Sequence, residues 1–227
     1  MIIKRNYNGI SLKFSLDDTT YKPDKFTRLM AKSIVIGISE LAIDVGTGSG
    51  ALAIMAKKLG ASKVIAVDIV TDFKRVFEKN CILNHVDIKF KKSNLLNNIK
   101  KADVIIANLA QTPFPKKIRD SVWGGPDGTD QLRKIIYQSH KKLNKNGRLY
   151  LGVVSLANPK RVKSLLYKHF KVRTINEMRR YISPKIANKW QPGFYNYLLS
   201  QQKKGLSFIY KDGKKRYYKF YVYEAIK

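Results

Sequence analysis

The chain contains a single cysteine, Cys81, among its 227 residues. One cysteine cannot form a disulfide within the chain, which excludes a disulfide-rich secreted scaffold and indicates a reducing compartment. No apolar run approaches the length of a membrane span, and residues 1–6 lack the apolar centre of a signal peptide. The three histidines and one cysteine form no cluster in the sequence that indicates a metal site. We therefore expect a cytoplasmic protein with no membrane segment and no bound metal.

Acidic residues are also scarce. The sequence has 16 aspartates and glutamates against 45 lysines and arginines, a formal net charge of +29. Such an excess attracts polyanions such as RNA or a ribosome. Lysine greatly outnumbers arginine, and asparagine and isoleucine are common, so compositional bias from an A+T-rich genome is an equal alternative. Hydrophobic residues make up 44% of the chain, enough for the core of one sizeable α/β domain.

A glycine turn between a strand and a helix is the most informative stretch. Residues 41–45 suit a buried strand, and from residue 51 the apolar spacing becomes helical. Between them stand Gly46, Gly48 and Gly50, which let the backbone pass close to a ligand. A turn of this kind at the end of a parallel strand presents free N–H groups, so we expect a ligand there.

Two classes of ligand use such a turn. Gly46, Gly48 and Ala51 match the dinucleotide pattern G-x-G-x-x-A, whereas Asp44 to Gly50 match D-x-G-x-G-x-G. The second pattern resembles motif I of the class I methyltransferases that use S-adenosylmethionine. Asp44 favours this second interpretation, because a carboxylate at the strand end suits the cationic amino-acid end of that cofactor and would repel a pyrophosphate. The resemblance implies that the cofactor contacts Asp44, Gly46, Thr47, Gly48 and Gly50. A tight turn without a ligand is the remaining alternative.

Two more strand ends extend the predicted cofactor site. A strand over 63–69 ends with Asp68 and Ile69, about twenty residues after the glycines. A carboxylate there can bind both ribose hydroxyls of an adenosine cofactor, or it can cap the next helix. Asn94 follows the strand at 87–92, at the place where similar methyltransferases often have an aspartate that holds the adenine amino group. The side-chain carbonyl of Asn94 can accept the same hydrogen bond.

The remaining pattern predicts an α/β fold with a doubly wound, mostly parallel, seven-stranded sheet whose last strand is antiparallel. Residues 1–37 form an N-terminal arm, a short strand pair, and a first helix capped by Asp24. Residues 38–227 form the catalytic domain, with an insertion at about 178–205, a loop over 178–193, and a C-terminal hairpin made of 206–210 and 216–225. We expect strands at 40–46, 63–69, 87–92, 103–107, 148–154, 170–177 and 216–225, and helices at 24–33, 49–59, 72–83, 129–143, 158–168 and 194–203.

Three stretches of residues 20–155 resemble the HemK-type glutamine N-methyltransferases. They are the segment that begins Tyr21-Lys22-Pro23, motif I, and the tetrad Asn108-Leu109-Ala110-Gln111 followed by Gly124-Gly125-Pro126-Asp127-Gly128. Family members have N-P-P-Y at the tetrad and G-G-x-D-G afterwards. The resemblance implies that the Asn108 carbonyl and the next backbone carbonyl accept hydrogen bonds from an acceptor NH2 beside the cofactor. Leu109 and Ala110 replace both prolines, and Gln111 replaces the tyrosine that stacks on the acceptor.

These patterns predict a methyltransferase that uses S-adenosylmethionine and methylates nitrogen on a protein or RNA acceptor. We assign Asn108 and Gln111 to catalysis, Asn108 also to cofactor binding, and Phe114, Trp123 and Tyr21 to acceptor binding. The alternatives are a small-molecule methyltransferase, a nucleotide-binding oxidoreductase, and an RNA-binding module that kept the fold without catalysis. For Asn108 the alternative is a polar strand end that satisfies loop N–H groups.

Overall fold

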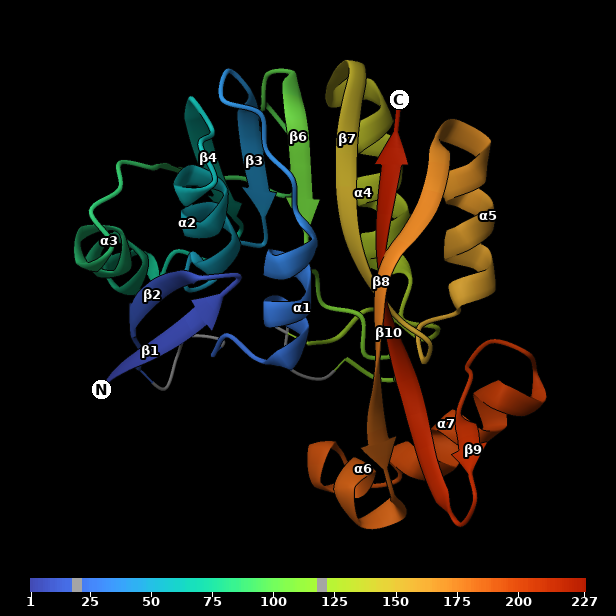
Figure 1. The fold of residues 1–227 in the computed structure, drawn as a ribbon. Coiled ribbons are helices and arrows are strands. Elements are labelled where there is room, and N and C mark those ends of the chain that lie inside the picture. The colour runs from blue at the N-terminus through green and yellow to red at the C-terminus, as the bar shows by residue number, and fades with distance from the viewer. Residues whose placement is uncertain (18–21, 118–121) are drawn as a thin grey trace.

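A computed structural model describes residues 1–17, 22–117 and 122–227 (Figure 1). At the N-terminus β1 (Ile2–Tyr7) and β2 (Ile10–Ser15) form an antiparallel hairpin separate from the main sheet. Leu12 and Phe14 of β2 have no exposed surface. Because alternate residues of a strand face the same side, these two side chains anchor the hairpin to the protein. The strand pair predicted for the arm is confirmed.

The main sheet contains the seven predicted strands and one short strand more. Its order is β5-β4-β3-β6-β7-β10-β8, and β9 pairs with β10 outside that path. The first five strands of this order run parallel, while β10 is antiparallel to both β7 and β8. The chain leaves β3 on one side toward β4 and later returns on the other side as β6, so the carboxyl ends of β3 and β6 meet at the switch point where ligands bind in such folds. The strands are β3 (Leu41–Val45), β4 (Lys63–Asp68), β5 (Lys89–Lys92), β6 (Ala102–Ala107), β7 (Leu143–Val154), β8 (Lys171–Ile182), β9 (Tyr210–Asp212) and β10 (Lys215–Ile226).

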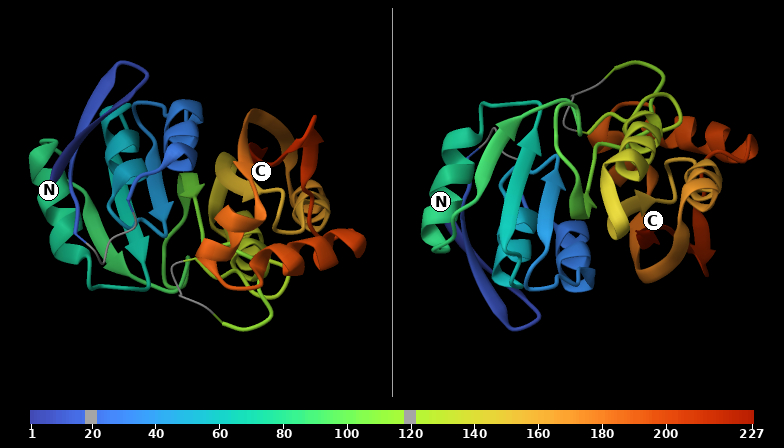
Figure 2. Two further views of the ribbon diagram at one scale, coloured as in Figure 1. Left: turned by 90° about the horizontal axis from the view of Figure 1, so that it is seen from below. Right: turned by 90° about the horizontal axis from the view of Figure 1, so that it is seen from above.

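Helices cover both faces of this sheet, as the doubly wound fold requires. Figure 2 shows α1 and α2 on one face and α4 on the other. The predicted cap of α1 is present, since Asp24 Oδ1 accepts hydrogen bonds from Phe26 N at 2.9 Å and Thr27 N at 3.0 Å. The helices are α1 (Lys25–Ser33), α2 (Ala51–Lys58), α3 (Lys74–Leu83), α4 (Asp130–Lys142), α5 (Pro159–His169), α6 (Pro184–Trp190) and α7 (Phe194–Lys203).

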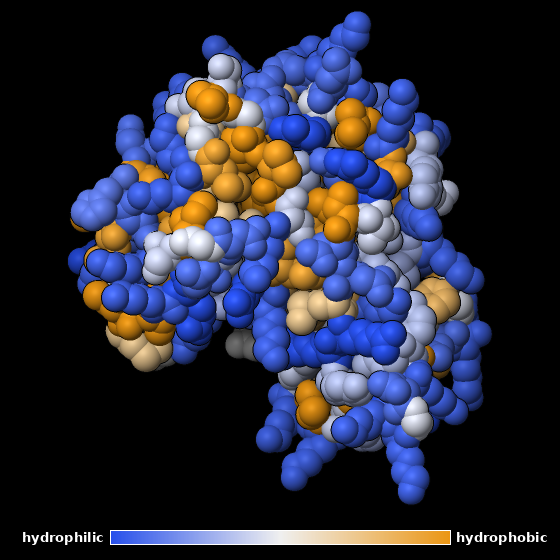
Figure 3. All heavy atoms as spheres, viewed as in Figure 1, coloured by the Kyte–Doolittle hydropathy of each residue, from blue (hydrophilic) through white to orange (hydrophobic). Residues whose placement is uncertain are grey.

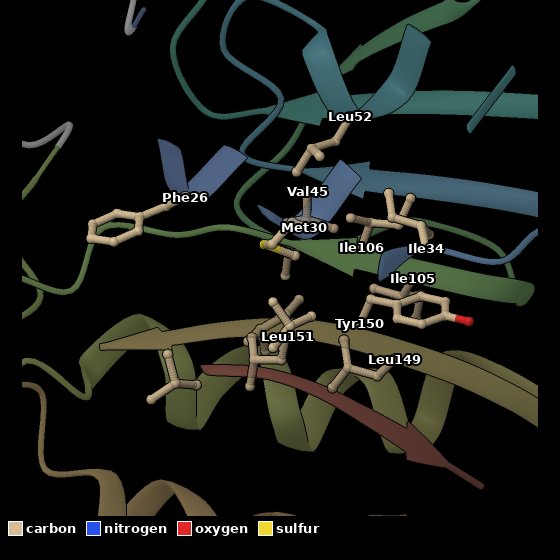
Figure 4. Packing of buried hydrophobic residues seen from close by; sticks show 14 of the residues in the cluster. Phe26, Met30, Ile34, Val45, Leu52, Ile105, Ile106, Leu149, Tyr150 and Leu151 are labelled. Carbon is tan, nitrogen blue, oxygen red and sulfur yellow. The ribbon is translucent and has the colours of Figure 1, made fainter. Parts of the chain in front are cut away.

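Helix α1 packs closely on β7 and β10. Met30 is fully buried, and a Cβ added at Gly152 would lie 2.8 Å from its Sδ atom. Phe26 stacks on Phe220 with ring centres 4.4 Å apart. Figure 4 shows Met30 directed into the apolar layer that also contains Leu151 and Tyr150, with the ring of Phe26 to one side of it. This packing places the beginning of α1 beside the carboxyl end of the sheet.

The region after residue 177 differs from the prediction of an inserted loop over 178–193. Strand β8 continues to Ile182, and α6 occupies Pro184–Trp190. The reason is the pairing partner, because β10 pairs with β8 from Arg216↔Ile182 to Ile226↔Lys171. Ser183 caps α6, and Pro184 takes the first helical position that proline favours.

The predicted strand at 206–210 is also wrong, because only Tyr210 belongs to a strand, β9. Phe208 N donates to Ser155 O at 2.8 Å, which ties the preceding segment to the end of β7 instead of to β10. The extended parts of β8 and β10, with α6, α7 and β9, project below the rest of the sheet (Figure 1). We call residues 178–220 the C-terminal lobe. Among the residues that the structure describes, no helix is long and apolar enough to cross a membrane.

Candidate active site

The glycine turn after β3 lies at the switch point of the sheet. Gly46, Gly48 and Gly50 have positive φ angles of 72°, 49° and 86°, a region that favours glycine. At Gly46 space is also restricted, because a Cβ would lie 2.8 Å from Leu109 Cδ2. At Gly48 no atom lies within 4 Å of a Cβ position, so that side of the turn is open. Gly50 faces away, toward α3, where a Cβ would meet Phe77 at 2.7 Å.

Asp44 is a buried carboxylate beneath this turn, with 1% of its surface exposed. Its Oδ2 accepts hydrogen bonds from Thr47 Oγ1 at 2.7 Å and Ala53 N at 3.0 Å. Burial raises the pKa of Asp44 to about 7; the hydrogen bonds from Thr47 and Ala53 offset this in part, and the nearby Asp68 raises it further. A neighbouring positive charge would favour the ionised form, so the site suits a cationic ligand group.

Asp68 lies across the turn at the end of β4. Its Oδ2 accepts from Gly48 N at 3.1 Å and its Oδ1 from Val70 N at 3.2 Å, while burial raises the pKa of Asp68. Ile69 beside it is 56% exposed, and Asn94 is exposed as well. A carboxylate can accept hydrogen bonds from ribose hydroxyls, and an exposed apolar side chain beside it can contact a base. A nucleoside requires both.

One cavity of about 980 Å³ connects these residues with the end of β6. This volume is at the upper end of the range for small-molecule sites. On the face drawn in Figure 3 hydrophilic residues predominate, and the surface is indented between the part that carries β1 and the part that carries α6. Of the predicted site residues, those that line the cavity are Asp44, Gly46, Thr47, Gly48, Asp68, Ile69, Asn94, Asn108 and Gln111; Gly50 does not.

Asn108 and Gln111 have different surroundings. Asn108 is half-buried, and its amide makes no hydrogen bond with any residue of the described ranges. The Nε2 of Gln111 donates to Leu109 O at 3.2 Å and Gly152 O at 3.1 Å, and its Oε1 accepts from Val154 N at 2.7 Å. The polar atoms of Gln111 therefore join the tetrad to β7. Asn108 is the tetrad side chain whose amide can meet an acceptor.

The loop with two adjacent glycines packs directly on Gln111. A Cβ at Gly124 would lie 2.5 Å from Gln111 Cα, and a Cβ at Gly128 would lie 2.6 Å from Gln111 O. Backbone hydrogen bonds add to this contact, from Thr112 N to Val122 O at 2.8 Å and from Gly124 N to Thr112 O at 3.0 Å. Glycine is required at both positions because the two backbones touch, and the contact holds the tetrad in place.

Two of the three residues that we assigned to acceptor binding, Phe114 and Trp123, do not form the cavity wall. Phe114 packs on Phe194 and Tyr197, with ring centres 6.1 Å and 5.5 Å apart, and Trp123 Nε1 donates to Phe114 O at 2.9 Å. Neither lines the cavity: the ring of Phe114 turns toward α7, and Trp123 hydrogen-bonds to the backbone of Phe114. Tyr21 lies outside the described residues.

The C-terminal lobe supplies an aromatic wall that sequence reasoning did not assign to the site. Trp190, Phe194, Tyr218 and Phe220 line the cavity, together with Arg180. The ring centre of Trp190 lies 6.2 Å from that of Tyr218 and 5.8 Å from the Arg180 guanidinium carbon. The alternation of Tyr218 and Phe220 along the last strand places them on one face. Which face turns to the cavity depends on the packing against α1 and α6.

Comparison with known proteins identifies the family. A family model for ribosomal protein L11 methyltransferase (PrmA) matches residues 30–121. A protein of Methanocaldococcus jannaschii, provisionally named protein N5-glutamine methyltransferase, is 31% identical over 159 residues, which are 67% of this chain and 80% of that protein. The chain belongs to the S-adenosylmethionine-dependent methyltransferases. The cofactor expected from motif I is thereby confirmed.

The methyltransferase also resembles longer proteins. The ribosomal protein L11 methyltransferase of Lactobacillus johnsonii is 35% identical over 163 residues, which are 70% of this chain and 45% of that protein. The methyltransferase thus spans less than half the length of this relative. A solved structure, the ribosomal protein L11 methylase of Lactobacillus delbrueckii subsp. bulgaricus, has a TM-score of 0.57 and 24% identity, with 93% of this chain and 83% of that chain covered. That likeness confirms the class I methyltransferase fold.

Proposed function

We propose that this methyltransferase transfers the methyl group of S-adenosylmethionine to a side-chain amide nitrogen of a protein acceptor, as the resemblance to HemK-type enzymes implies. The observation that carries the proposal is the amide of Asn108. It lines the same cavity as Asp44 and Asp68, and makes no hydrogen bond within the described ranges. The Asn108 carbonyl can accept a hydrogen bond from an acceptor NH2. Leu109 O accepts one hydrogen bond, from Gln111 Nε2, and retains a second lone pair for the acceptor.

The residues around motif I fit the cofactor. S-adenosylmethionine supplies an electrophilic methyl group on a sulfonium and carries an ammonium group. Asp44 is a carboxyl that a nearby cation would ionise, since burial raises its pKa to about 7. Asp68 and the exposed Ile69 provide a hydroxyl acceptor and an apolar contact for the nucleoside. The role of these residues is to bind and orient the cofactor, while Asn108 orients the acceptor nitrogen, so catalysis rests on positioning.

Charge favours a neutral amide acceptor over a lysine ammonium. Four cations line the described part of the cavity: Lys22, Lys117, Arg180 and Lys189. The carboxylates there are Asp44 and Asp68, which we assign to the cofactor, and Asp24, which caps α1 and lies 3.9 Å from Arg180. A cationic acceptor would meet like charge, which disfavours its binding.

The aromatic wall supports a planar acceptor. In the HemK-type pattern the tyrosine of the tetrad stacks on the acceptor, and Gln111 stands in its place. Two aromatic side chains from other elements also line this cavity: Trp190 from α6 and Tyr218 from β10. We infer that Trp190, which is 38% exposed, supplies the stacking surface that the tetrad lacks.

The test is incubation of the methyltransferase with radiolabelled S-adenosylmethionine and fractionated cell extract. We expect label in protein, and mass spectrometry of the labelled peptide should place the methyl group on an amide nitrogen. Asn108→Ala should abolish transfer while calorimetry still detects cofactor binding. Asn196→Ala, at an exposed position of α7, is the matched control and should transfer at the normal rate.

Other outcomes would overturn parts of the proposal. Label on a lysine would refute the amide acceptor. Label in RNA would refute the protein acceptor. Label in the small-molecule pool would refute it too, and would indicate a biosynthetic methyltransferase. An unchanged rate for Asn108→Ala would remove Asn108 from the mechanism.

A further inference from the structure

The positive charge of the chain is unevenly distributed. Residues 131–227 contain 24 of the 45 lysines and arginines but three of the 16 acidic residues, a net charge of +21. Residues 1–130 contain 21 basic and 13 acidic residues, a net charge of +8. A genomic bias toward lysine would affect the whole chain, so it does not explain the concentration in the C-terminal part. Of these basic residues only Arg180 and Lys189 line the described part of the cavity, so most of the positive charge of this part lies outside the active site.

A row of tyrosines, five of them in contact with one another, crosses this part of the protein. The ring centres of Tyr221 and Tyr223 are 5.9 Å apart, and those of Tyr210 and Tyr217 are 5.4 Å apart, both pairs stacked. The hydroxyls of Tyr210 and Tyr221 lie 3.1 Å apart and join the two pairs. Tyr181 meets Tyr217 edge-on at 6.3 Å at one end of the row. Tyr167 of α5 makes no ring contact with these five within the described residues, but it lies near enough to Tyr223 to add, after the larger effect of burial, to the rise in the pKa of Tyr223. We call these six residues the tyrosine row: Tyr167, Tyr181, Tyr210, Tyr217, Tyr221 and Tyr223.

The tyrosine row lies on the face of β10 that is turned away from the active site. Tyr218 and Phe220 line the cavity, so Tyr217 and Tyr221, one residue removed from each, point to the other side of the strand. The rings at the two ends of the row are open to solvent, with Tyr167 55% and Tyr181 49% exposed. The four rings between them are buried or half-buried and form the support.

Cationic side chains lie over the tyrosine row along its length. Lys163 Nζ is 5.6 Å from the ring centre of Tyr167, and Lys215 Nζ is 5.6 Å from that of Tyr181. Between them, Arg179 lies 4.8 Å from the ring of Tyr217, and Lys219 lies 5.6 Å from Tyr210 and 5.9 Å from Tyr221. Such contacts hold each cation above a ring.

Two carboxylates accompany the row, and both are engaged. Glu177 Oε1 accepts from Lys219 Nζ at 2.8 Å, and Asp212 Oδ2 accepts from the Tyr181 hydroxyl at 3.1 Å. Four cations against two carboxylates leave the row positive, and Lys163 and Lys215 form no ion pair with the described residues.

We propose that the tyrosine row is a docking surface for single-stranded RNA, separate from the active site. Nucleobases would stack on the exposed rings of Tyr167 and Tyr181, and the cations between them would contact phosphates. An acidic protein would match the charge but has no need of open aromatic rings at both ends. RNA matches both features, because every nucleotide carries a planar base and an anionic phosphate.

The test is fluorescence anisotropy of the full chain with a labelled 12-nucleotide single-stranded RNA of mixed sequence, titrated at several salt concentrations. Tyr167→Ala and Tyr181→Ala remove a ring without changing charge, and each should weaken binding at least about fivefold. Lys163→Gln with Lys215→Gln should reduce the dependence of log affinity on log salt by roughly 0.7 for each cation removed. Unchanged melting temperature and cofactor binding would verify that the variants fold.

Helix α4 provides a matched control. Tyr137 is 53% exposed, with Lys141 Nζ 4.3 Å from its ring centre, and it packs on His169 instead of joining the row. Tyr137→Ala and Lys141→Gln should therefore leave RNA affinity and its salt dependence close to those of the native chain. Equal losses from the α4 variants and the row variants would overturn the proposal in favour of diffuse charge. So would normal binding by the Tyr167→Ala, Tyr181→Ala double variant, or poly-glutamate binding as tightly as RNA.

Discussion

Replacement of Asp44 by asparagine should separate the stability of the protein from its affinity for the cofactor. Asparagine has the same shape, and its side-chain oxygen can accept the hydrogen bonds from Thr47 Oγ1 and Ala53 N. The substitution removes a carboxylate that is 1% exposed and whose pKa is raised to about 7. We therefore expect Asp44→Asn to stabilise the cofactor-free protein at alkaline pH while it weakens cofactor binding.

The magnitude follows from the pKa of Asp44. The folded state keeps the proton up to a pH of about 7, whereas the unfolded chain releases it near its ordinary value of 3.8. The native protein accordingly loses stability as pH rises between these values, because the unfolded chain binds fewer protons there. At 1.36 kcal/mol per unit, the loss is about 2 kcal/mol at pH 5 and about 4 kcal/mol at pH 8. The advantage of Asp44→Asn should then grow by roughly 2 to 3 kcal/mol from pH 5 to pH 8.

The assay is urea denaturation of both proteins without cofactor at pH 5 and pH 8. The pH-independent effects of the substitution cancel in the difference between the two pH values. Asp68, the neighbour that raises the pKa of Asp44, is present in both proteins. Calorimetry with S-adenosylhomocysteine at pH 8 should show affinity reduced about 10- to 100-fold, the value of a hydrogen bond to a charged group. A stability difference that does not change with pH, or an unchanged affinity, would refute the reasoning.

Three further substitutions test how the cavity is assembled. Gln111→Leu leaves the buried Val154 N–H without its partner, so unfolding free energy should fall by about 2 to 4 kcal/mol, and the transfer rate should fall more than cofactor affinity does. Gly128→Ala places a Cβ 2.6 Å from Gln111 O at a φ of 78°, and should cost about 1 to 3 kcal/mol on denaturation and slow transfer. Trp190→Ala should raise the KM for the acceptor with an unchanged Kd for S-adenosylmethionine. Trp190→Phe keeps an aromatic ring, so its KM should be close to that of the native protein. Equal effects of the two variants would argue against stacking. In each case calorimetric cofactor binding is the control.

The cofactor half of the cavity could be predicted because its signals are local. A strand, alternate glycines and a helix occur within 41–58, and each glycine has a positive φ that the turn requires. Asp68 is brought to the same turn by the parallel pairing of β4 with β3, which the βαβ order of the sequence implies. The structure places both Asp44 and Asp68 in the lining of one cavity.

The acceptor half could not be predicted in the same way. By its position in the sequence Gln111 replaces a stacking tyrosine. In the structure its amide forms hydrogen bonds with the backbone of β7, more than forty residues later in the chain. Phe114 is close to the tetrad in sequence but turns toward α7 in space, and Trp123 bonds to the backbone of Phe114. Contacts between distant segments decide such orientations, and residue type carries little information about them.

The amino-acid sequence alone determined the alternation of strands and helices, the glycine turn with its carboxylate, and the excess of positive charge, because these depend on neighbouring residues and on composition. Tertiary structure alone decided that β8 continues to Ile182, since its hydrogen bonds come from β10. It also decided that one face of β10 turns Tyr218 and Phe220 to the cavity while the other presents the tyrosine row. Alternation in a strand specifies two faces, and packing of Tyr218 and Phe220 against α1 and α6 selects which face lines the site.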